Sequence, residues 1–214
     1  MTAAARVLVA LLLAGPAHAD DEVAKAAPAA QERWRIVARA SHAQFWVRLF
    51  GVVPLTGSFP SIDGAISLDP AADRARVEAD VAAASVRMRR PGHTAWARSA
   101  EFFDAKRHPT IRFESQPFPL SRLDGGGAIE GRLTLRGVTR PVAFSIQQAR
   151  CAGIDAQAGA GPRRCVVQLA GTIDRAAFGM RTRGATVANR VTLRFHIEAA
   201  PDPGSAPTAT PSSS

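Results

Sequence analysis

Hydrophobic and polar residues alternate with a period of two along almost the whole chain between residues 34 and 198. Such alternation is typical of β-strands that bury one face and expose the other. It is clearest near the C-terminus, where one face carries Val191, Leu193, Phe195 and Ile197 and the other carries Thr192, Arg194, His196 and Glu198. Consecutive strands joined by short turns close most economically into a barrel, because a closed sheet has no exposed edge. The pattern therefore predicts an all-β fold, an antiparallel up-and-down β-barrel of about eight strands.

One segment, residues 93–103, breaks the alternation. Trp96, Ala100 and Phe103 recur there at helical spacing, which predicts a short helix that Thr94 caps at its start. The segment ends with Phe102 and Phe103. These two rings either line or plug one end of the barrel, or they pack the helix against it, and the pattern fits both interpretations.

Residues 1–19 have the composition of a cleavable export signal. Arg6 precedes an unbroken apolar run at residues 7–14, and Ala17-His18-Ala19 matches a cleavage site. The run is too short for a membrane anchor, which needs about 20 apolar residues. We therefore expect a periplasmic protein. Residues 20–33 and 199–214 are rich in Ala, Pro and Ser without periodicity, so we expect flexible segments flanking one folded domain, residues 34–198.

The chain has two cysteines, Cys151 and Cys165, on either side of a segment rich in Gly, Ala and Pro. In an oxidising compartment such a pair is expected to form a disulfide, which would stabilise a long turn between two strands by about 3 kcal/mol in the chain-entropy model. The alternative, a redox or metal-binding pair, lacks both C-x-x-C spacing and neighbouring histidines. We therefore predict a structural disulfide.

The chain is basic, with 27 Lys and Arg against 18 Asp and Glu, a formal net charge of +9. This excess suits an anionic partner such as nucleic acid, a membrane surface or an acidic ligand. Export argues against nucleic acid and leaves peripheral contact with a membrane surface as the expectation. Arg87, Arg89 and Arg90 either meet an anionic head group or form an ordinary solvated run of charge.

The sequence carries no catalytic or metal-binding motif. Its five histidines are scattered, and it has no G-x-S-x-G elbow, P-loop, or G-x-G-x-x-G motif after a strand. The acid–base candidates fall on the face that alternation assigns to solvent; they are Glu78, Asp80, Glu130, His196 and Glu198. We therefore predict a protein that is not an enzyme and needs no metal or cofactor.

Several segments, in a fixed order, carry a resemblance to a known family. They are residues 41–48 (SHAQFWVR), 57–64 (GSFPSIDG), 98–104 (RSAEFFD), 108–113 (HPTIRF), 131–142 (GRLTLRGVTRPV), Arg175 with 178–180 (FGM), and 191–198. Each is a weak signal alone, but their common order is specific. In these segments the chain resembles the YceI-like family of periplasmic lipid-binding proteins, also called polyisoprenoid-binding domains. It departs from the family at residues 89–97 (RRPGHTAWA), where a charged run containing His and Asp is usual.

The resemblance implies an elongated, lipocalin-like barrel that holds a long-chain isoprenoid or quinone-like amphiphile as a carrier or reservoir. Together with the phase of alternation it assigns the ligand-binding wall to Phe45, Val47, Ile66, Val77, Val81, Phe102, Phe103, Phe113, Leu133, Leu135, Phe144, Phe178, Leu193 and Phe195. Alternatively, the same side chains interdigitate as a dry core, because hollow and filled barrels share one pattern. The protein would then be a periplasmic adaptor or accessory protein of a membrane electron-transfer or stress system. The oligomeric state stays open.

Overall fold

The computed structural model describes residues 31–152 and 163–205. The expected export signal, most of the expected N-terminal segment, the end of the C-terminal segment and residues 153–162 between the cysteines lie outside the described residues. The folded region is slightly longer than the pattern indicated. Its first strand begins at Glu32 and its last strand ends at Pro201, instead of at residues 34 and 198.

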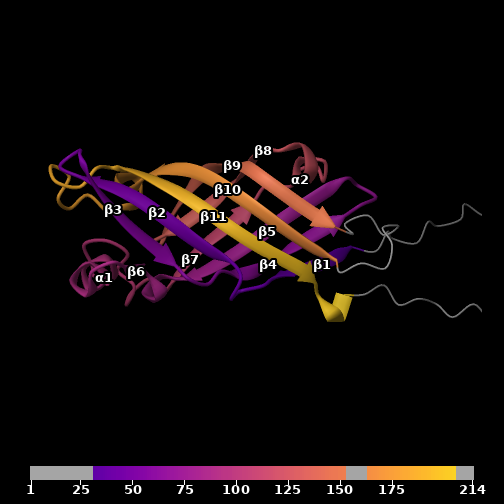
Figure 1. Ribbon diagram of the computed structural model, residues 1–214, viewed down its shortest axis with the longest axis horizontal. Coiled ribbons are helices and arrows are strands. Elements are labelled where there is room, and N and C mark those ends of the chain that lie inside the picture. The colour runs from indigo at the N-terminus through magenta and orange to yellow at the C-terminus, as the bar shows by residue number, and fades with distance from the viewer. Residues whose placement is uncertain (1–30, 153–162, 206–214) are drawn as a thin grey trace, which may run out of the picture.

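The described residues form eleven β-strands and two short helices in an elongated arrangement (Figure 1). The strands are β1 (Glu32–Ile36), β2 (His42–Leu49), β3 (Val53–Phe59), β4 (Asp63–Asp69), β5 (Arg74–Ala82), β6 (Arg87–Met88), β7 (Thr110–Ser115), β8 (Gly127–Leu135), β9 (Val138–Ala152), β10 (Arg164–Asp174) and β11 (Arg190–Pro201). The helices are α1 (Pro91–Arg98) and α2 (Arg122–Gly125), with 3-10 turns η1 (Ala83–Ser85), η2 (Arg175–Phe178) and η3 (Pro203–Ser205).

Eight of these strands close into an antiparallel barrel. Around the ring the order is β1, β4, β5, β7, β8, β9, β10 and β11, and the pairing of β1 with β11 closes it. The remaining strands extend the sheet, because β2 pairs with β11, β3 with β2, and β6 with β3. The predicted antiparallel barrel of about eight strands is thus confirmed. The alternation did not predict that β2, β3 and β6 lie outside the ring as an extension of the sheet.

Strand β11 pairs with two successive strands on the same side. Its C-terminal part lies against β1, with Ala199 opposite Ile36, and its N-terminal part lies against β2, with His196 opposite His42. The chain leaves the sheet between these pairings, at residues 37–41. A break of this kind exposes backbone donors and acceptors of β11 that must find other partners, because buried peptide groups are almost always hydrogen-bonded.

The side chain of Ser41 supplies those partners. Its Oγ accepts a hydrogen bond from the Glu198 amide at 3.0 Å and donates one to the Glu198 carbonyl at 3.3 Å, and the Val37 amide donates to the same carbonyl at 2.7 Å. Ser41 is fully buried. One hydroxyl therefore continues the hydrogen bonding of β11 where its neighbour changes from β1 to β2.

Alternation assigned the faces of the strands correctly at most positions, with one informative exception. Phe45, Val47, Ile129 and Leu133 are buried, as expected of the inward face. Glu198 was expected on the solvent face, but its side chain is only 12% exposed and forms an ion pair with Arg164. Period-two patterns assign a direction to a side chain, but they do not reveal what covers it.

The predicted helix is present but shifted. Helix α1 starts at Pro91, which suits a first helical position because it lacks an amide hydrogen to satisfy. Thr94 lies inside the helix, where its Oγ accepts from the Met88 amide at 3.0 Å, so the prediction that it caps the start was wrong. The helix ends at Arg98 and is followed by Ser99, whose Oγ donates to the Trp96 carbonyl at 2.7 Å and accepts from the Glu101 amide at 3.3 Å. Among the helices in the described ranges, none has the length and apolar character needed to cross a membrane.

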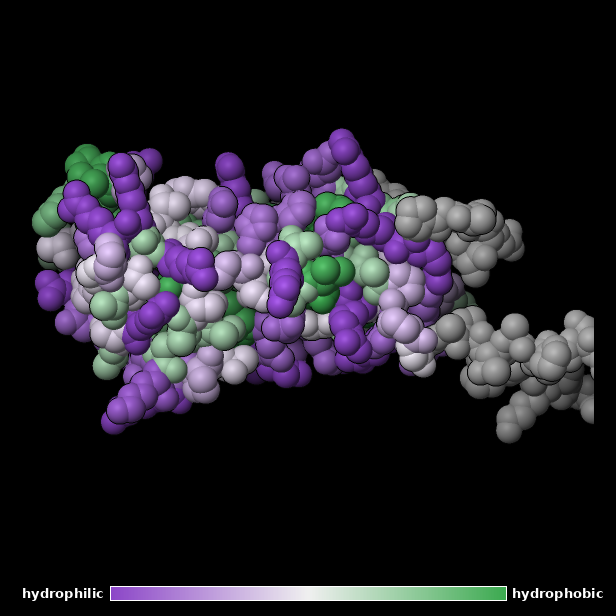
Figure 2. All heavy atoms as spheres, turned by 60° about the horizontal axis from the view of Figure 1, so that its bottom comes forward, coloured by the Kyte–Doolittle hydropathy of each residue, from purple (hydrophilic) through white to green (hydrophobic). Residues whose placement is uncertain are grey.

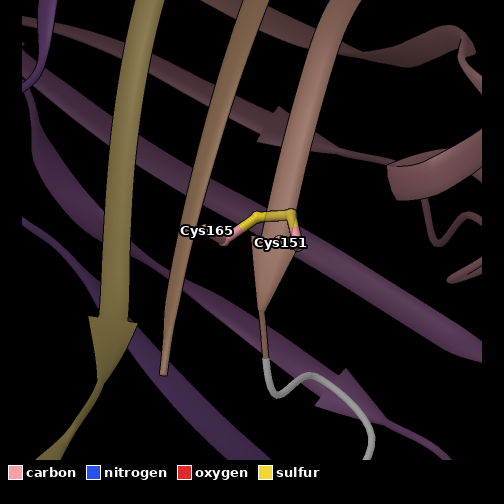
Figure 3. The surroundings of a disulfide bond; sticks show 2 residues. All are labelled: Cys151 and Cys165. Atoms are coloured by element: carbon pink, nitrogen blue, oxygen red, sulfur yellow. A yellow bond between two sulfur atoms is a disulfide. The ribbon is translucent and has the colours of Figure 1, made fainter. Parts of the chain in front are cut away.

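The two ends of the barrel differ. One end, which we call the α1 end, holds α1 and four chain segments, residues 48–53, 83–109, 136–140 and 174–190 (Figure 1). The opposite end holds α2 and the cysteine pair. Cys151 of β9 lies directly opposite Cys165 of β10, and their sulfur atoms are bonded in the structure (Figure 3). The bond joins β9 and β10 close to where β9 ends and β10 begins.

We expect Ser41→Ala to lower the free energy of unfolding by about 1–3 kcal/mol, because the Glu198 amide would be buried without an acceptor. Denaturant unfolding measures the change. Ser145→Ala, at an exposed position of β9, is the matched control and should shift stability by less than about 0.5 kcal/mol. Equal effects of the two substitutions would show that Ser41 does not support the break between β1 and β2.

Candidate functional site

Two apolar chambers lie one after the other inside the barrel. Chamber 1, at the α1 end, has a volume of about 110 Å³ and reaches residues of α1 and of the 174–190 segment. Chamber 2, toward the disulfide end, has a volume of about 110 Å³ and is walled by strands, by Ile62 before β4 and by Leu123 of α2. The interior is therefore neither a single open tunnel nor a fully packed core.

The structure places thirteen of the fourteen predicted wall residues on these chambers. Chamber 1 is lined by Phe45, Val47, Phe102, Phe103, Leu135 and Leu193, chamber 2 by Ile66, Val77, Phe113 and Phe144, and both by Val81, Leu133 and Phe195. Phe178 lines neither chamber. It is 2% exposed and packs with Leu133, Leu135 and Met180 in the core of the α1 end.

Other lining residues were not among the predicted ones. Ile111 and Ile129 follow the same inward phase as their neighbours, so alternation carried a signal for them. Trp96, Met180 and Val187 also line chamber 1, but they come from α1 and the 174–190 segment. Residues outside strands have no period-two phase, and only the tertiary packing brings these three to the chamber.

Four side chains separate the chambers. Val81, Ile111, Leu133 and Phe195 line both of them, and Val81 lies directly opposite Ile111 across β5 and β7. We call these four residues the constriction. Each chamber is smaller than the roughly 300–1,000 Å³ typical of pockets for drug-sized ligands. A long ligand that occupies both chambers would contact the side chains of the constriction.

Three inward-facing glycines leave space at the barrel wall that phenylalanine rings of neighbouring strands occupy. A Cβ at Gly57 would lie 2.2 Å from the Phe45 ring, one at Gly131 2.6 Å from the Phe113 ring, and one at Gly171 2.6 Å from the Phe144 ring. The three rings belong to chamber walls. Because each ring occupies the space that a Cβ would fill, it stays out of the central space, and the glycines keep the interior hollow.

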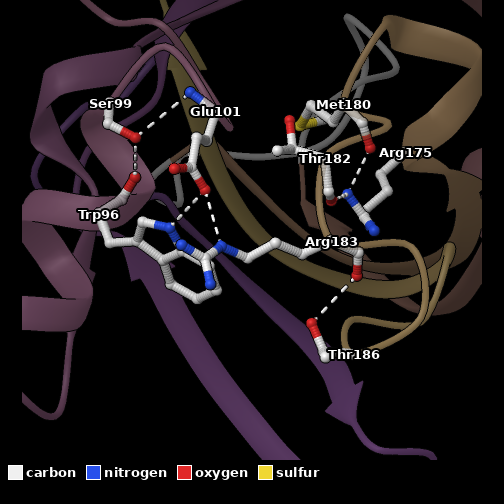
Figure 4. A network of polar contacts seen from close by, with 8 residues as sticks. All are labelled: Trp96, Ser99, Glu101, Arg175, Met180, Thr182, Arg183 and Thr186. Atoms are coloured by element: carbon white, nitrogen blue, oxygen red, sulfur yellow. Dashed lines mark hydrogen bonds and ion pairs between the residues drawn. The ribbon is translucent and has the colours of Figure 1, made fainter.

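A polar network joins two of the segments that make up the α1 end (Figure 4). The Glu101 carboxylate accepts hydrogen bonds from Nε of Arg183 at 2.9 Å and from Nε1 of Trp96 at 3.0 Å. The Arg183 hydrogen bond, followed by that of Trp96, lowers the pKa of Glu101 below its ordinary value. Arg183 also lies over the Trp96 ring, 5.4 Å from its centroid. This network joins the segment of α1 to the 174–190 segment.

Arg175 organises the 174–190 segment from inside. Its guanidinium is buried and donates hydrogen bonds to four carbonyls, those of Met180, Thr182, Val187 and Ala188 (Figure 4 shows two of the four). Burial lowers the pKa of Arg175 below its ordinary value. Although Arg175 belongs to the wall of chamber 1, four of its five N–H groups donate to the backbone, so it shapes this part of the wall.

The carboxylates of the mid-barrel wall lie outside. Glu78, Asp80 and Glu114 surround Arg112 with ion pairs of 3.8, 3.3 and 3.1 Å on the outer surface of β5 and β7. Within the described ranges, no cluster of three or more His, Cys, Asp or Glu residues is placed to hold a metal ion. The residues that line the chambers themselves are nearly all apolar.

We expect Gly57→Ala to destabilise the protein by about 1–3 kcal/mol, because the new Cβ must push the Phe45 ring into chamber 1. Gly57 lies directly opposite Phe45 across β2 and β3, and the three closest atoms are all in that ring. In a Phe45→Leu background the same change should cost much less. Denaturant unfolding of the four proteins gives the coupling, and an additive result would contradict the packing of this ring on Gly57.

Comparisons with known proteins agree with this architecture. The family model of the YceI-like domain matches residues 34–199. A UPF0312 protein of Ectopseudomonas mendocina is 33% identical over 145 residues, which cover 66% of this chain and 69% of the relative.

Two solved structures have the same fold. BcnA of Burkholderia cenocepacia has a TM-score of 0.61 at 22% identity and covers 75% of this chain and 96% of its own. A polyisoprenoid binding domain of Saccharophagus degradans has a TM-score of 0.60 at 17% identity and covers 79% and 98%. At these identities the likeness shows a shared fold. Since the family model spans nearly the whole barrel, the chain belongs to the YceI-like domain family.

Proposed function

We propose that the protein is a periplasmic, non-enzymatic carrier that holds a long-chain isoprenoid or quinone-like amphiphile inside its barrel. The observation that carries this proposal is the pair of apolar chambers aligned along the barrel and separated only by the constriction. Burial of apolar surface is worth about 25 cal/mol per Å² and requires no directed contact. An interior of this kind suits a repetitive hydrocarbon chain.

Family membership and the fold of the Saccharophagus degradans domain, which is described as polyisoprenoid binding, support the same ligand class. The binding role is supported further by the wall of the chambers. Among the residues that line the chambers, Arg175 alone is charged, and four of its five N–H groups donate to backbone carbonyls. Catalysis on a bound lipid would need an ionisable group free to exchange protons with it.

The compartment is part of the proposal. We infer that residues 1–19 direct export and are then removed, and that Cys151 and Cys165 are oxidised in the periplasm. The direct pairing of the two cysteines across β9 and β10 supports this, because a disulfide between them needs no rearrangement of the strands. The mass of the exported protein tests both points, as the processed chain would lack residues 1–19 and two hydrogen atoms.

Native mass spectrometry of the exported protein, followed by organic extraction, tests the ligand. We expect a stoichiometric prenyl or quinone-type species, or its uptake when long-chain isoprenoids are added. A bare mass that persists after such incubation would overturn the carrier proposal. It would favour the alternative of an accessory protein that acts through its surface.

We expect Leu133→Arg to reduce bound lipid at least about tenfold, because a charge in the constriction must be desolvated against a hydrocarbon chain. Val81→Phe fills the same constriction without adding charge and should also reduce binding. It provides the test in case the Leu133→Arg variant does not fold. Arg132→Ala, at an exposed position of the same strand, is the control and should bind normally. Normal binding by folded Val81→Phe and Leu133→Arg would contradict a ligand that spans both chambers.

A further inference from the structure

The turn between β2 and β3 presents an exposed apolar tip. Phe50, Val52 and Val53 are 69%, 75% and 51% exposed, and only one other large hydrophobic residue in the described ranges, Val37, is exposed. Single exposed apolar residues are ordinary, but three within four consecutive positions at a loop tip form a patch. Figure 2 shows hydrophobic surface gathered at the left-hand end of the molecule, next to hydrophilic side chains.

The tip is held in a fixed and strained shape. Phe50 and Gly51 both have positive φ angles, 50° and 73°, and the Val52 amide donates to the Leu49 carbonyl at 3.1 Å. Turns of this kind favour Asn, Asp or Gly at both central positions, because a bulky side chain is strained there. The Phe50 amide is tied to the Thr186 carbonyl at 2.7 Å. The turn therefore holds the Phe50 side chain outward, although the positive φ angle at this position favours Asn.

The positive charge of the protein gathers at the end of the barrel that carries this tip. The four segments of the α1 end contain thirteen Lys and Arg and three Asp and Glu, a net charge of +10. The other described residues contain twelve Lys and Arg and eleven Asp and Glu. Eleven of the thirteen basic side chains are exposed; they are Arg48, Arg87, Arg89, Arg90, Arg98, Lys106, Arg107, Arg140, Arg181, Arg183 and Arg190. Nearly all of the net charge of the described chain thus lies at one end.

Chamber 1 lies behind the same end. Trp96 and Phe102 from the α1 segment and Met180 and Val187 from the 174–190 segment line it. Val187 also forms a bridge with Leu49, next to the tip, and the Arg136 side chain donates to the Phe102 carbonyl at 2.7 Å. The tip, the basic surface and chamber 1 are therefore joined by direct contacts and keep a fixed relation to one another.

We propose that the α1 end docks on an anionic phospholipid membrane, with Phe50, Val52 and Val53 inserted among the lipids and the exposed arginines of the same end at the phosphate head groups. Interfacial binding combines a small buried apolar area with attraction between basic residues and anionic lipid, and both components are present here. A stable protein partner would require about 800 Å² of complementary surface, whereas a projecting tip of three apolar residues suits a fluid partner that closes around it. Docking rests on this surface alone, and only the passage of lipid into chamber 1 depends on the proposed function.

Co-sedimentation of the exported protein with vesicles tests the docking. One set of vesicles contains equal amounts of phosphatidylglycerol and phosphatidylcholine, and the other contains phosphatidylcholine only. We expect binding to the anionic vesicles, weaker binding as salt is raised, and little binding to the neutral ones. Absence of binding to the anionic vesicles at low salt would overturn the proposal, as would equal binding to both sets. Salt-sensitive binding to an acidic protein without binding to vesicles would also overturn it.

Two pairs of variants separate the contributions. Phe50→Asn with Val52→Ser should reduce vesicle binding about tenfold or more while preserving the fold, because Asn suits the turn better than Phe. Val37→Ser, at the exposed hydrophobic residue away from the tip, is the control. Arg89→Gln with Arg90→Gln should reduce binding about tenfold or more, and Arg74→Gln with Arg76→Gln, at the opposite end of the barrel, should leave it unchanged. Equal effects of the tip variant and its control would refute insertion of the tip.

Lipid content of the same variants, measured by native mass spectrometry, keeps the two proposals apart. If the protein binds anionic vesicles but never carries lipid, the docking proposal stands and the carrier proposal fails. If it carries lipid but does not bind vesicles, the carrier proposal stands and the docking proposal fails.

Discussion

Backbone hydrogen bonds between β1 and β11 turn a curved sheet into a closed barrel. They join residues from opposite ends of the folded region, with Trp34 opposite Pro201 and Ile36 opposite Ala199. Closure removes both edges of the eight-stranded ring and turns its apolar face inward at every strand. The arrangement leaves one weak point, where β11 exchanges β1 for β2, and there the Ser41 hydroxyl replaces a strand as hydrogen-bonding partner.

The interior shows how an apolar barrel keeps free space. Large rings would normally fill the centre, because protein interiors pack as densely as organic crystals. Here Phe45, Phe113 and Phe144 lie against glycines of neighbouring strands and leave two chambers. The constriction between the chambers is made of side chains and not of backbone, so the length of the usable space depends on rotamers. Such an interior adapts to an apolar chain without changing the sheet.

The two ends of the barrel carry different features. The cysteine pair of β9 and β10 lies at one end, whereas the α1 end combines the exposed tip, the basic surface and chamber 1. Polar contacts hold the α1 end together, notably the four carbonyls held by the buried Arg175 and the more exposed contacts of Glu101 with Arg183 and Trp96. If both proposals hold, the surface that meets the membrane and the space that receives the lipid belong to one rigid unit.

The sequence by itself determined the fold class, most of the strand faces and most of the chamber walls, because period-two alternation is a local consequence of strand geometry. It also carried the family resemblance in short segments. It did not reveal the exclusion of Phe178 from the chambers, the burial of Glu198 beneath Arg164, or the internal position of Thr94 in α1. These features depend on what packs against each residue from distant parts of the chain.

The tertiary structure alone decided whether the barrel is hollow and where its charge gathers. The space beside Gly57 is set by Phe45 on a different strand, and the chamber receives Trp96 and Val187 from segments about ninety residues apart. The arginines are spread along the whole sequence, but the meander of strands brings thirteen basic residues to one end. Volume and electrostatic field are properties of the assembled surface, and no local pattern encodes them because they arise only when the sheet closes.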